Sequence, residues 1–388
     1  MWSSWDWALL IVCLGVTLLS AAVAVRLVIA SRRIRWHPIL PEAGDQATQL
    51  TVISPARNEA QDLGASVQSI LDQMGVNLEV IIVNDHSTDS TGSIADTAAQ
   101  ADRRVRVIHD PPLPAGWLGK CNAMHRAAAV ASGDYLLFTD ADIRHHPWCL
   151  AIALLEREQH QFDFLSLLPL MQCVSLWESV LTPGFAWGIM PRFARPGLRD
   201  GTAAEAYAAG AFMLVRRAAF QAVGGFEDIK ADMCDDIALA RRLKKSGYRV
   251  GVRAAPELLQ VRLFKSGSDA FWGPTKNVLS ALHGKLWLAP AMLLGTLVVF
   301  WTSLVCVAVG AWQGKPALLL AGTIAYAVQY ASLWPSRWLF RFHPAGALLF
   351  PLAVISLWCC LVRALYHYAV HGAILWRGRA VKVRGRSR

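Results

Sequence analysis

The chain has 388 residues, of which 54% are hydrophobic and only 17% are charged, and its formal net charge is +10. This length allows one sizeable domain with additional elements, and the apolar excess excludes an ordinary soluble protein. The basic residues gather beside apolar segments and at the C-terminal end, which indicates attraction to anionic lipid headgroups and argues against nucleic acid as a partner. Eight cysteines without CxxC pairs indicate reduced thiols, with neither a disulfide framework nor a zinc site.

An apolar run opens the chain. Residues 7–29 are almost uncharged, and the basic residues Arg32, Arg33 and Arg35 follow them. The run is too long for the core of a signal peptide, so residues 1–35 are expected to form a retained membrane anchor. Positive charge after the anchor predicts that the chain beyond it lies in the cytoplasm and that the N-terminus lies outside.

Strand and helix patterns alternate in the segment that follows the anchor. β-prone apolar runs and helical apolar spacing succeed each other from residue 50 onward. The alternation predicts an α/β domain, assigned to residues 50–280, with a mainly parallel sheet and helices on both faces. The expected strands are 50–54, 78–83, 105–108 and 135–138, and the expected helices are 59–74, 90–101 and 120–131.

Polar side chains follow the first two expected strands. Asn84 and Asp85 close the second strand, and Glu59 lies in the loop after the first. An acid at a strand end can accept hydrogen bonds from a nucleobase or a ribose, and Glu59 can line the same pocket. Ordinary turn chemistry explains these residues equally, because Asn and Asp are common in turns.

A basic residue opens the helix expected at 120–131. Gly119 permits close approach of the backbone to a ligand, and Lys120 at the helix start supplies a positive charge for phosphate. The segment is not a Walker loop, because it lacks the required glycine spacing and the Ser or Thr.

Two carboxylates end the strand expected at 135–138. Asp140 and Asp142 are one residue apart, so they project the same way if the extended conformation continues. Carboxylates at the carboxyl end of a buried strand occupy the place where open α/β sheets bind ligands, and a hard divalent cation carrying phosphates is their natural partner. A solvated acidic loop is an equally good explanation of this motif alone.

A second acidic pair, Asp235 and Asp236, opens a helix later in the chain. Acids at a helix N-terminus are favoured by the helix dipole, and that effect alone explains them. The alternative is a general base that deprotonates the hydroxyl of an acceptor substrate. The sequence leaves both interpretations open.

Two segments near the expected membrane boundary have open interpretations. Residues 183–197 mix aromatic residues with prolines and arginines, which is typical of an interfacial element but also of a packed aromatic core. Arg262, Lys265 and Lys276 precede the next apolar segment, where they can hold a diphosphate or anchor to lipid headgroups.

Apolar segments return near the C-terminus. Residues 286–312, 317–333 and 345–368 are each long enough to cross a bilayer, so 286–376 is expected to be a C-terminal transmembrane region. Three further crossings would leave the basic tail, 377–388, outside, against the positive-inside rule. One stretch is therefore expected to be re-entrant or interfacial, or the last segment doubles back, with the tail in the cytoplasm.

Taken together, the motifs resemble the family 2 glycosyltransferases, which are inverting enzymes with a GT-A fold. The resemblance covers residues 50–280. The matching stretches are 55–59, 84–89, 116–120, 140–142, 210–217, 224–226 and 235–239. Residues 116–120 and 261–264 look most like the membrane-bound branch that glycosylates isoprenoid lipids, to which the carotenoid-acid and hopanoid-associated glycosyltransferases belong.

The resemblance implies that four residues bind the nucleotide part of a nucleotide-sugar donor. Asp85 would bind the base, with Glu59 nearby. Lys120 and Arg262 would lie near the diphosphate. UDP is the commonest nucleotide in such enzymes, so a UDP-sugar is the default donor.

The two acidic pairs take the remaining implied roles. Asp140 would face the ribose or sugar, and Asp142, with Asp140 beside it, would coordinate Mg²⁺ or Mn²⁺ on the diphosphate. Asp236 would be the catalytic base, and its neighbour Asp235 stands where relatives often carry Glu.

One departure from the family pattern bears on the product. Processive members, such as cellulose and hyaluronan synthases, carry a QxxRW motif, whereas here Arg262 follows Gln260 too early and no tryptophan completes the motif. The resemblance therefore implies transfer of one sugar to a lipid acceptor (a carotenoid, a hopanoid or another polyprenyl lipid) by a multi-pass protein of the bacterial inner membrane. The alternatives are a processive polysaccharide synthase and a non-catalytic membrane protein that keeps the fold for binding.

Overall fold

The computed structural model describes residues 2–38, 45–198, 201–275, 286–371, 374–376 and 379–381. The chain divides into two compact units. One, the sheet unit, comprises residues 33–171 and 195–261, and the other, the helical unit, comprises residues 1–32, 172–194 and 262–388. The helical unit therefore takes in a segment, 172–194, that lies within the sequence range assigned above to the α/β domain.

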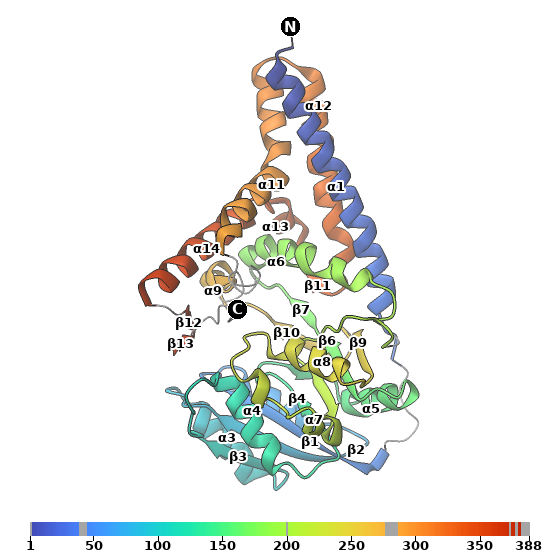
Figure 1. Ribbon diagram of the computed structural model, residues 1–388, viewed down its shortest axis with the longest axis vertical. Helices are drawn as coiled ribbons and strands as arrows, with labels where there is room; N and C mark the ends of the chain where they lie inside the picture. The colour runs from blue at the N-terminus through green and yellow to red at the C-terminus, as the bar shows by residue number, and fades with distance from the viewer. Residues whose placement is uncertain are drawn as a thin grey trace. The chain divides into compact units, whose positions relative to one another are not determined.

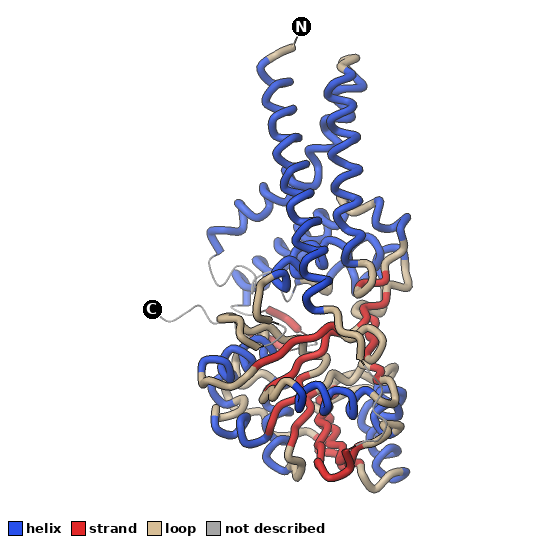
Figure 2. The backbone as a smooth tube through the Cα atoms, turned by 90° about the vertical axis from the view of Figure 1, so that its right-hand side faces the viewer, coloured by secondary structure: helices blue, strands red, loops and turns tan. Residues whose placement is uncertain are grey.

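A mixed sheet forms the centre of the sheet unit (Figures 1 and 2). Seven strands of the described chain form it, in the order β3-β2-β1-β4-β8-β6-β9. They are β1 (Asp45–Ala56), β2 (Val76–Asn84), β3 (Val105–His109), β4 (Tyr135–Phe138), β6 (Phe164–Leu168), β8 (Met213–Arg216) and β9 (Val250–Ala254). The first four strands along the chain pair in parallel, and only β8 runs antiparallel to its neighbours β4 and β6. This arrangement confirms the mainly parallel sheet predicted from the sequence.

Apolar residues alternate between the two faces of the central strands, so each face has its own core. Val52 of β1 packs in the core that includes helix α2, whereas its neighbour Ile53 packs in the core that includes α4 and α8. The helices of this unit are α2 (Leu63–Leu71), α3 (Thr91–Ala101), α4 (Gly119–Val130), α5 (Cys149–Gln159), α7 (Arg217–Ala222) and α8 (Asp235–Lys245). The predicted helices on both faces are thus confirmed.

The first of these helices is shorter than the apolar spacing of 59–74 predicted. Asn58 adopts a positive φ of 53°, and the backbone N–H groups of Asp62 and Leu63 both bond to the carbonyl of Glu59. The chain therefore turns before α2 begins, which leaves Glu59 in a loop at the end of β1. Gly75, with a φ of 71°, follows the other end of the helix.

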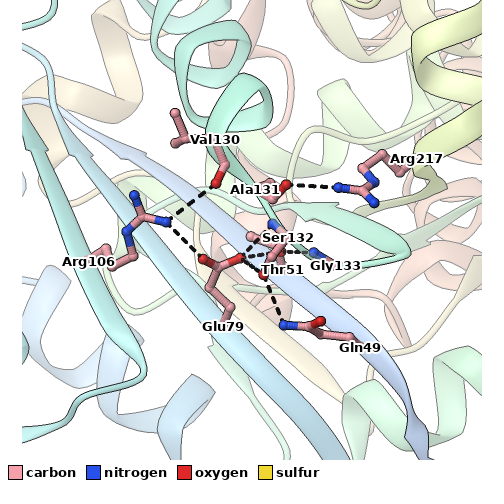
Figure 3. A network of polar contacts seen from close by, with 9 residues as sticks. All are labelled: Gln49, Thr51, Glu79, Arg106, Val130, Ala131, Ser132, Gly133 and Arg217. Carbon is pink, nitrogen blue, oxygen red and sulfur yellow. Dashed lines mark hydrogen bonds and ion pairs between the residues drawn. The ribbon is translucent and has the colours of Figure 1, made fainter.

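A partly buried carboxylate holds the start of β4 against β1 and β2 (Figure 3). Glu79 accepts hydrogen bonds from the Thr51 hydroxyl at 2.7 Å and from the backbone N–H and hydroxyl of Ser132 at 3.0 and 2.8 Å. Arg106 pairs with its other oxygen at 3.2 Å, and Thr51 in turn accepts from the N–H of Gly133. Because β4 begins two residues after Gly133, this network fixes the register that carries Asp140 to the end of the sheet.

We expect Glu79→Gln to lower the free energy of unfolding by about 1–3 kcal/mol, since the buried Thr51 hydroxyl and the partly exposed donors around it lose their charged acceptor. Burial opposes ionisation, but the hydrogen bonds from Ser132, Thr51 and Arg106 outweigh it and lower the pKa of Glu79. The stabilisation is therefore complete at neutral pH, above the unfolded pKa of about 4.3, and is lost as pH falls through the lower folded pKa.

Thermal melting of the detergent-purified protein at several pH values measures this effect. The gap in melting temperature between wild type and Glu79→Gln should be about 2–4 °C for each kcal/mol at pH 7, and should close in acid. Glu158→Gln, at an exposed position on α5, is the matched control and should melt like wild type. A gap that does not change with pH would contradict the ionic character of the network.

Four helices in the described part of the chain are long and apolar enough to cross a membrane by length and composition. They are α1 (Ser4–Ile34), α11 (Ala289–Trp312), α12 (Pro316–Leu333, extended as a span to Ser336) and α14 (Leu352–His371). All belong to the helical unit. They coincide with the apolar segments predicted from the sequence, except that the segment 345–368 is interrupted at residues 349–351 between α13 (Pro344–Leu348) and α14.

The aromatic segment 183–197, for which two interpretations were open, is partly buried, and both interpretations stay predictions. Helix α6 (Leu176–Ile189) and the 3₁₀ helix η1 (Met190–Ala194) bury Pro183, Ala186 and Phe193, although Trp177 near the start of α6 is half exposed. The capping box of Ser175 and Glu178 begins α6. The remaining short elements are β5 (Arg144–His145), β7 (Leu170–Gln172), η2 (Glu227–Ile229), β10 (Leu259–Arg262), α9 (Gly267–Trp272), η3 (Leu286–Leu288), η4 (Trp334–Ser336), β11 (Phe340–Arg341), β12 (Ile374–Trp376) and β13 (Arg379–Val381).

Candidate active site

The carboxyl ends of three neighbouring strands place most of the predicted site residues at one edge of the sheet. The N–H of Asp85 bonds to the carbonyl of Ala56 at the end of β1, and the N–H of Thr139 bonds to the carbonyl of Ile53. These bonds extend the ladders of β2 and β4 by one residue, so the chain emerges at the same edge on both sides of β1. Open α/β sheets bind ligands at this edge.

Asp85 and the Glu59 loop form the more buried end of this edge. Glu59 and Asp85 are only 5% and 4% exposed. An Asp85 oxygen lies 3.0 Å from Nδ1 of His86, and Arg57 donates to the Asp85 carbonyl at 2.8 Å. The N–H of Glu59 donates to the hydroxyl of Thr91 at 2.8 Å. Both acids are thus held in place, which agrees with a role in binding and disfavours solvated turns.

Lys120 links the end of β4 to the start of α8. Its Nζ lies 2.7 Å from an oxygen of Asp140 and 3.8 Å from Oδ2 of Asp235. Burial alone would lower the pKa of Lys120, but the Asp140 and Asp235 carboxylates outweigh it and raise that pKa. The lysine therefore remains a cation, and the two acidic pairs, separated by more than 90 residues of sequence, meet at one positive charge.

Asp236 is held in a defined orientation at the first turn of α8. One of its oxygens accepts the N–H of Gly210 at 2.9 Å, and the other accepts the N–H of Ile237 at 2.7 Å. Burial, reinforced by the charge of Asp235, raises the pKa of Asp236 to about 7. Burial also raises the pKa of Asp235, whose Oδ2 has no hydrogen-bond partner among the described residues. A carboxylate that exchanges a proton near neutral pH is suited to general base catalysis.

Gly210 is a site residue whose contact the sequence did not predict, since it appeared there only as the start of a motif. The segment around it is fixed from both sides: the N–H of Ala209 donates to the Ser166 hydroxyl at 2.9 Å, and the Thr139 hydroxyl donates to the carbonyl of Ala211 at 2.8 Å. A Cβ at position 210 would lie 3.0 Å from Nζ of Lys120. Glycine therefore lets the backbone N–H reach Asp236 beside the lysine.

The family model described as Glycosyl transferase family 2 matches residues 51–224, which include all three strand ends of this site. Residues 51–224 are a family 2 glycosyltransferase domain. The sequence is 24% identical over 353 residues to a 4,4'-diaponeurosporenoate glycosyltransferase of Staphylococcus aureus, covering 86% of this chain and 88% of that protein. It is 36% identical over 93 residues to glycosyltransferase GlyG of Streptococcus pneumoniae, where the match covers 24% of this chain and spans only 30% of GlyG.

A solved structure shows the fold of this glycosyltransferase. The mannosyltransferase PcManGT from Pyrobaculum calidifontis, whose structure was solved with GDP-Man and Mn²⁺, superimposes with a TM-score of 0.55 at 18% identity. The superposition covers 92% of this chain and 99% of PcManGT. The likeness confirms the GT-A fold.

Arg262 has a defined partner in the helical unit of the glycosyltransferase. It ends β10 and pairs with the buried carboxylate of Glu178 at 2.7 Å, at the capping box of α6. The seven other predicted site residues belong to the sheet unit. Contact of Arg262 with a diphosphate stays a prediction, and Lys276 lies outside the described residues.

The acids at the end of β4 fit a divalent ion that also binds a diphosphate. Asp140 and Asp142 are both partly exposed, and carboxylate oxygens are the ligands that Mg²⁺ and Mn²⁺ prefer. Within the described ranges, no group of three or more His, Cys, Asp or Glu side chains is arranged to hold an ion. A site with one or two protein carboxylates, completed by phosphate oxygens and water, is the usual arrangement for Mg²⁺ in nucleotide enzymes.

Proposed function

We propose that this glycosyltransferase moves one sugar from a nucleotide-sugar, with inversion, to the hydroxyl of a lipid acceptor. The observation that carries the proposal is the meeting of Asp236, with its pKa near neutrality, and the Lys120–Asp140 pair in one site. Asp236 takes the proton of the acceptor hydroxyl as the oxygen bonds to the anomeric carbon. The bond between that carbon and the diphosphate oxygen breaks, and the nucleoside diphosphate leaves with the electron pair.

The donor would lie along the edge formed by β1, β2 and β4. Asp85 and Glu59, both buried and held by neighbours, would bind the base and ribose. Asp140 and Asp142 would hold Mg²⁺ or Mn²⁺, which when bound supplies charge neutralisation for the departing diphosphate. Lys120 offers a second positive charge at the same place, since its ammonium group already contacts Asp140.

A membrane lipid is the acceptor class that the chain favours. Four helices of the described residues suit a bilayer by length and composition, and the long match is to a protein named for glycosylating a carotenoid acid. The missing QxxRW pattern argues against long-polymer synthesis. We therefore place the protein in the bacterial inner membrane as a multi-pass enzyme, with the sheet unit in the cytoplasm, a UDP-sugar as donor, and a carotenoid, hopanoid or other polyprenyl lipid as acceptor.

Transfer by the detergent-purified enzyme tests this function. The protein is incubated with a panel of UDP- and GDP-sugars, total bacterial lipid extract and Mg²⁺ or Mn²⁺, with EDTA as the metal-free arm, and the lipids are analysed by mass spectrometry. A metal-dependent lipid carrying one added hexose is the expected product. A polymeric product would overturn single-sugar transfer, and silence with all donors, together with no metal-dependent nucleotide binding, would overturn the enzymatic role.

A further inference from the structure

Helices α11 and α12 form an antiparallel pair, and positions along it show how far other elements of the helical unit reach along the helix bundle. A Cβ on Gly310 would lie 2.4 Å from the backbone of Leu319, and the Ser303 hydroxyl donates to the side chain of Gln329 at 2.7 Å. The two helices therefore run side by side from the 313–315 turn to their opposite ends. Close glycine contacts and polar bonds between helices are the means by which apolar helices associate in membranes.

Helix α1 joins this pair with its N-terminal end beside the 313–315 turn (Figure 1). Asp6 pairs with Lys315, and the thiol of Cys306 lies 3.8 Å from the carbonyl of Leu9. The other ends of the three helices, at Ile34, Ala289 and Leu333, therefore lie at the opposite side of the bundle. The chain passes from α1 into the sheet unit at Arg33.

Helix α13 enters the bundle from that opposite side and stops halfway along it. The Tyr330 hydroxyl bonds to the carbonyl of Pro344, and the Tyr326 hydroxyl, one turn deeper on α12, bonds to that of Leu348. The indole N–H of Trp301 bonds to the carbonyl of Pro351 at 3.1 Å. Twelve residues separate Ala289 from Trp301, a rise of about 18 Å, against about 30 Å for a hydrocarbon core.

Helix α14 then returns along the first half of α11. The indole N–H of Trp358 bonds to the hydroxyl of Thr296 at 3.2 Å, and Leu361 and Ala364 pack against Ala289, the first residue of α11. The sequence of contacts runs from Trp301 back to Ala289 as α14 advances. Helix α14 is therefore antiparallel to α11 and leaves the bundle on the side where α11 begins.

The break between α13 and α14, residues 349–351, has the hydrogen bonds that a site in the hydrocarbon core requires. A break in helical structure leaves carbonyls without helical partners, and in hydrocarbon each unpaired group costs several kcal/mol. Here the N–H groups of Leu352, Ala353 and Val354 bond to the three carbonyls of the break, those of residues 349–351. The Tyr326 hydroxyl bonds to the carbonyl of Leu348 at the end of α13, and the Trp301 indole adds a second bond to that of Pro351. Such a break is tolerated at membrane depth only where protein groups satisfy it.

We infer that α13 and α14 form a re-entrant hairpin that reaches the middle of the bilayer and returns to the cytoplasmic side. The chain then crosses the membrane three times, by α1, α11 and α12, although α14 is long enough for a fourth crossing. The exposed apolar stripe of α14 faces the acyl chains of the cytoplasmic leaflet. That stripe consists of Ile355, Val362, Tyr366 and Val370.

Charge placement agrees with this topology. The ionisable side chains described in α14, Arg363 and His367, lie in its last three turns, where the returning helix reaches the headgroups. The basic tail at 377–388 then stays on the same side as Arg32 and Arg33, as the positive-inside rule requires. A fourth crossing would carry all of these positive charges to the outer surface. The inference concerns membrane topology and does not depend on the proposed sugar transfer.

Reporter fusions to the full-length chain test on which side the tail lies. Alkaline phosphatase needs disulfides and is active only outside the cytoplasm, whereas green fluorescent protein fluoresces only when it folds inside. We expect fluorescence and no phosphatase activity from fusions after Arg388, and phosphatase activity from an insertion after Gly314, which serves as the outside reference. Phosphatase activity at Arg388 would overturn the hairpin in favour of a fourth crossing.

A depth measurement distinguishes the hairpin from a helix lying on the membrane surface. A nitroxide is attached to Leu349→Cys, at an exposed position of the tip, and its accessibility to oxygen and to a water-soluble nickel complex is compared in vesicles. Leu297→Cys, an exposed position near the middle of α11, gives the deep reference, and Val370→Cys the shallow one. The unsubstituted chain gives the background from native thiols. We expect position 349 to be as deep as 297, and headgroup depth at 349 would overturn the inference.

Discussion

Asp236→Asn is expected to reduce the turnover of sugar transfer by about 10²–10⁴-fold while donor binding stays unchanged. Asparagine keeps the shape of the side chain and an oxygen that can accept the N–H of Gly210, now 2.9 Å from the carboxylate. It cannot take a proton from the acceptor hydroxyl. The change therefore removes the base and keeps the bond to Gly210, at the loss of the acceptor for the N–H of Ile237. Steady-state turnover reports the chemistry, and calorimetric titration of the nucleotide reports donor binding.

If Asp236 is the base, the activity of the wild-type enzyme should depend on pH in a defined direction. Burial raises the pKa of Asp236 to about 7, so the base is protonated and inactive below that pH. The value of kcat/KM should rise with pH up to about 7 and then level. Asp235→Asn is the matched comparison, because it removes the neighbouring carboxylate and leaves Asp236 able to accept a proton. Retained turnover in Asp236→Asn, or a larger loss in Asp235→Asn, would move the role of base away from Asp236.

The parts of the site that the sequence predicted are those determined by local pattern. Asp85 and Asp140 follow short apolar runs that are typical of buried strands, and parallel strands bring such ends to one edge of a sheet. The Lys120–Asp140 pair joins residues 20 apart in the sequence, and the Gly210–Asp236 bond joins residues 26 apart. Both contacts depend on the packing of α4, β8 and α8. No periodicity encodes those contacts.

Membrane topology, too, depends on contacts between distant segments that the local sequence pattern does not reveal. Hydropathy identified the apolar segment at 345–368 because length and composition are local properties. It did not predict the break at 349–351, although Pro351 is a possible signal, since proline disfavours the helical conformation of the residue before it. The break is acceptable in a membrane because backbone N–H groups at the start of α14 bond to its carbonyls, and because Tyr326 and Trp301, on other helices, add side-chain donors. A membrane-spanning helix and a re-entrant hairpin that reaches only the middle of the bilayer can therefore have similar sequences.

Lys120→Met is expected to shift the pH profile of transfer to higher pH, by about one pH unit, and to lower turnover at pH 7. Lys120 is the cation that faces Asp140 and Asp235, and its charge also favours the ionised form of Asp236. Without it, the carboxylates of Asp140, Asp235 and Asp236 lose the positive charge that they share, so the pKa of Asp236 rises further. The base is then protonated over more of the neutral range.

This pH shift separates two roles that a simple loss of activity would confuse. If Lys120 only held the diphosphate of the donor, its removal would raise KM for the nucleotide-sugar and leave the pH midpoint of kcat near 7. Lys120→Arg should restore the midpoint, because it restores the positive charge, even where its planar group fits the site poorly. Lys245→Met, at an exposed position at the end of α8, removes a charge without touching the site and should change neither quantity. An unchanged midpoint in Lys120→Met would show that the lysine binds donor without setting the state of the base.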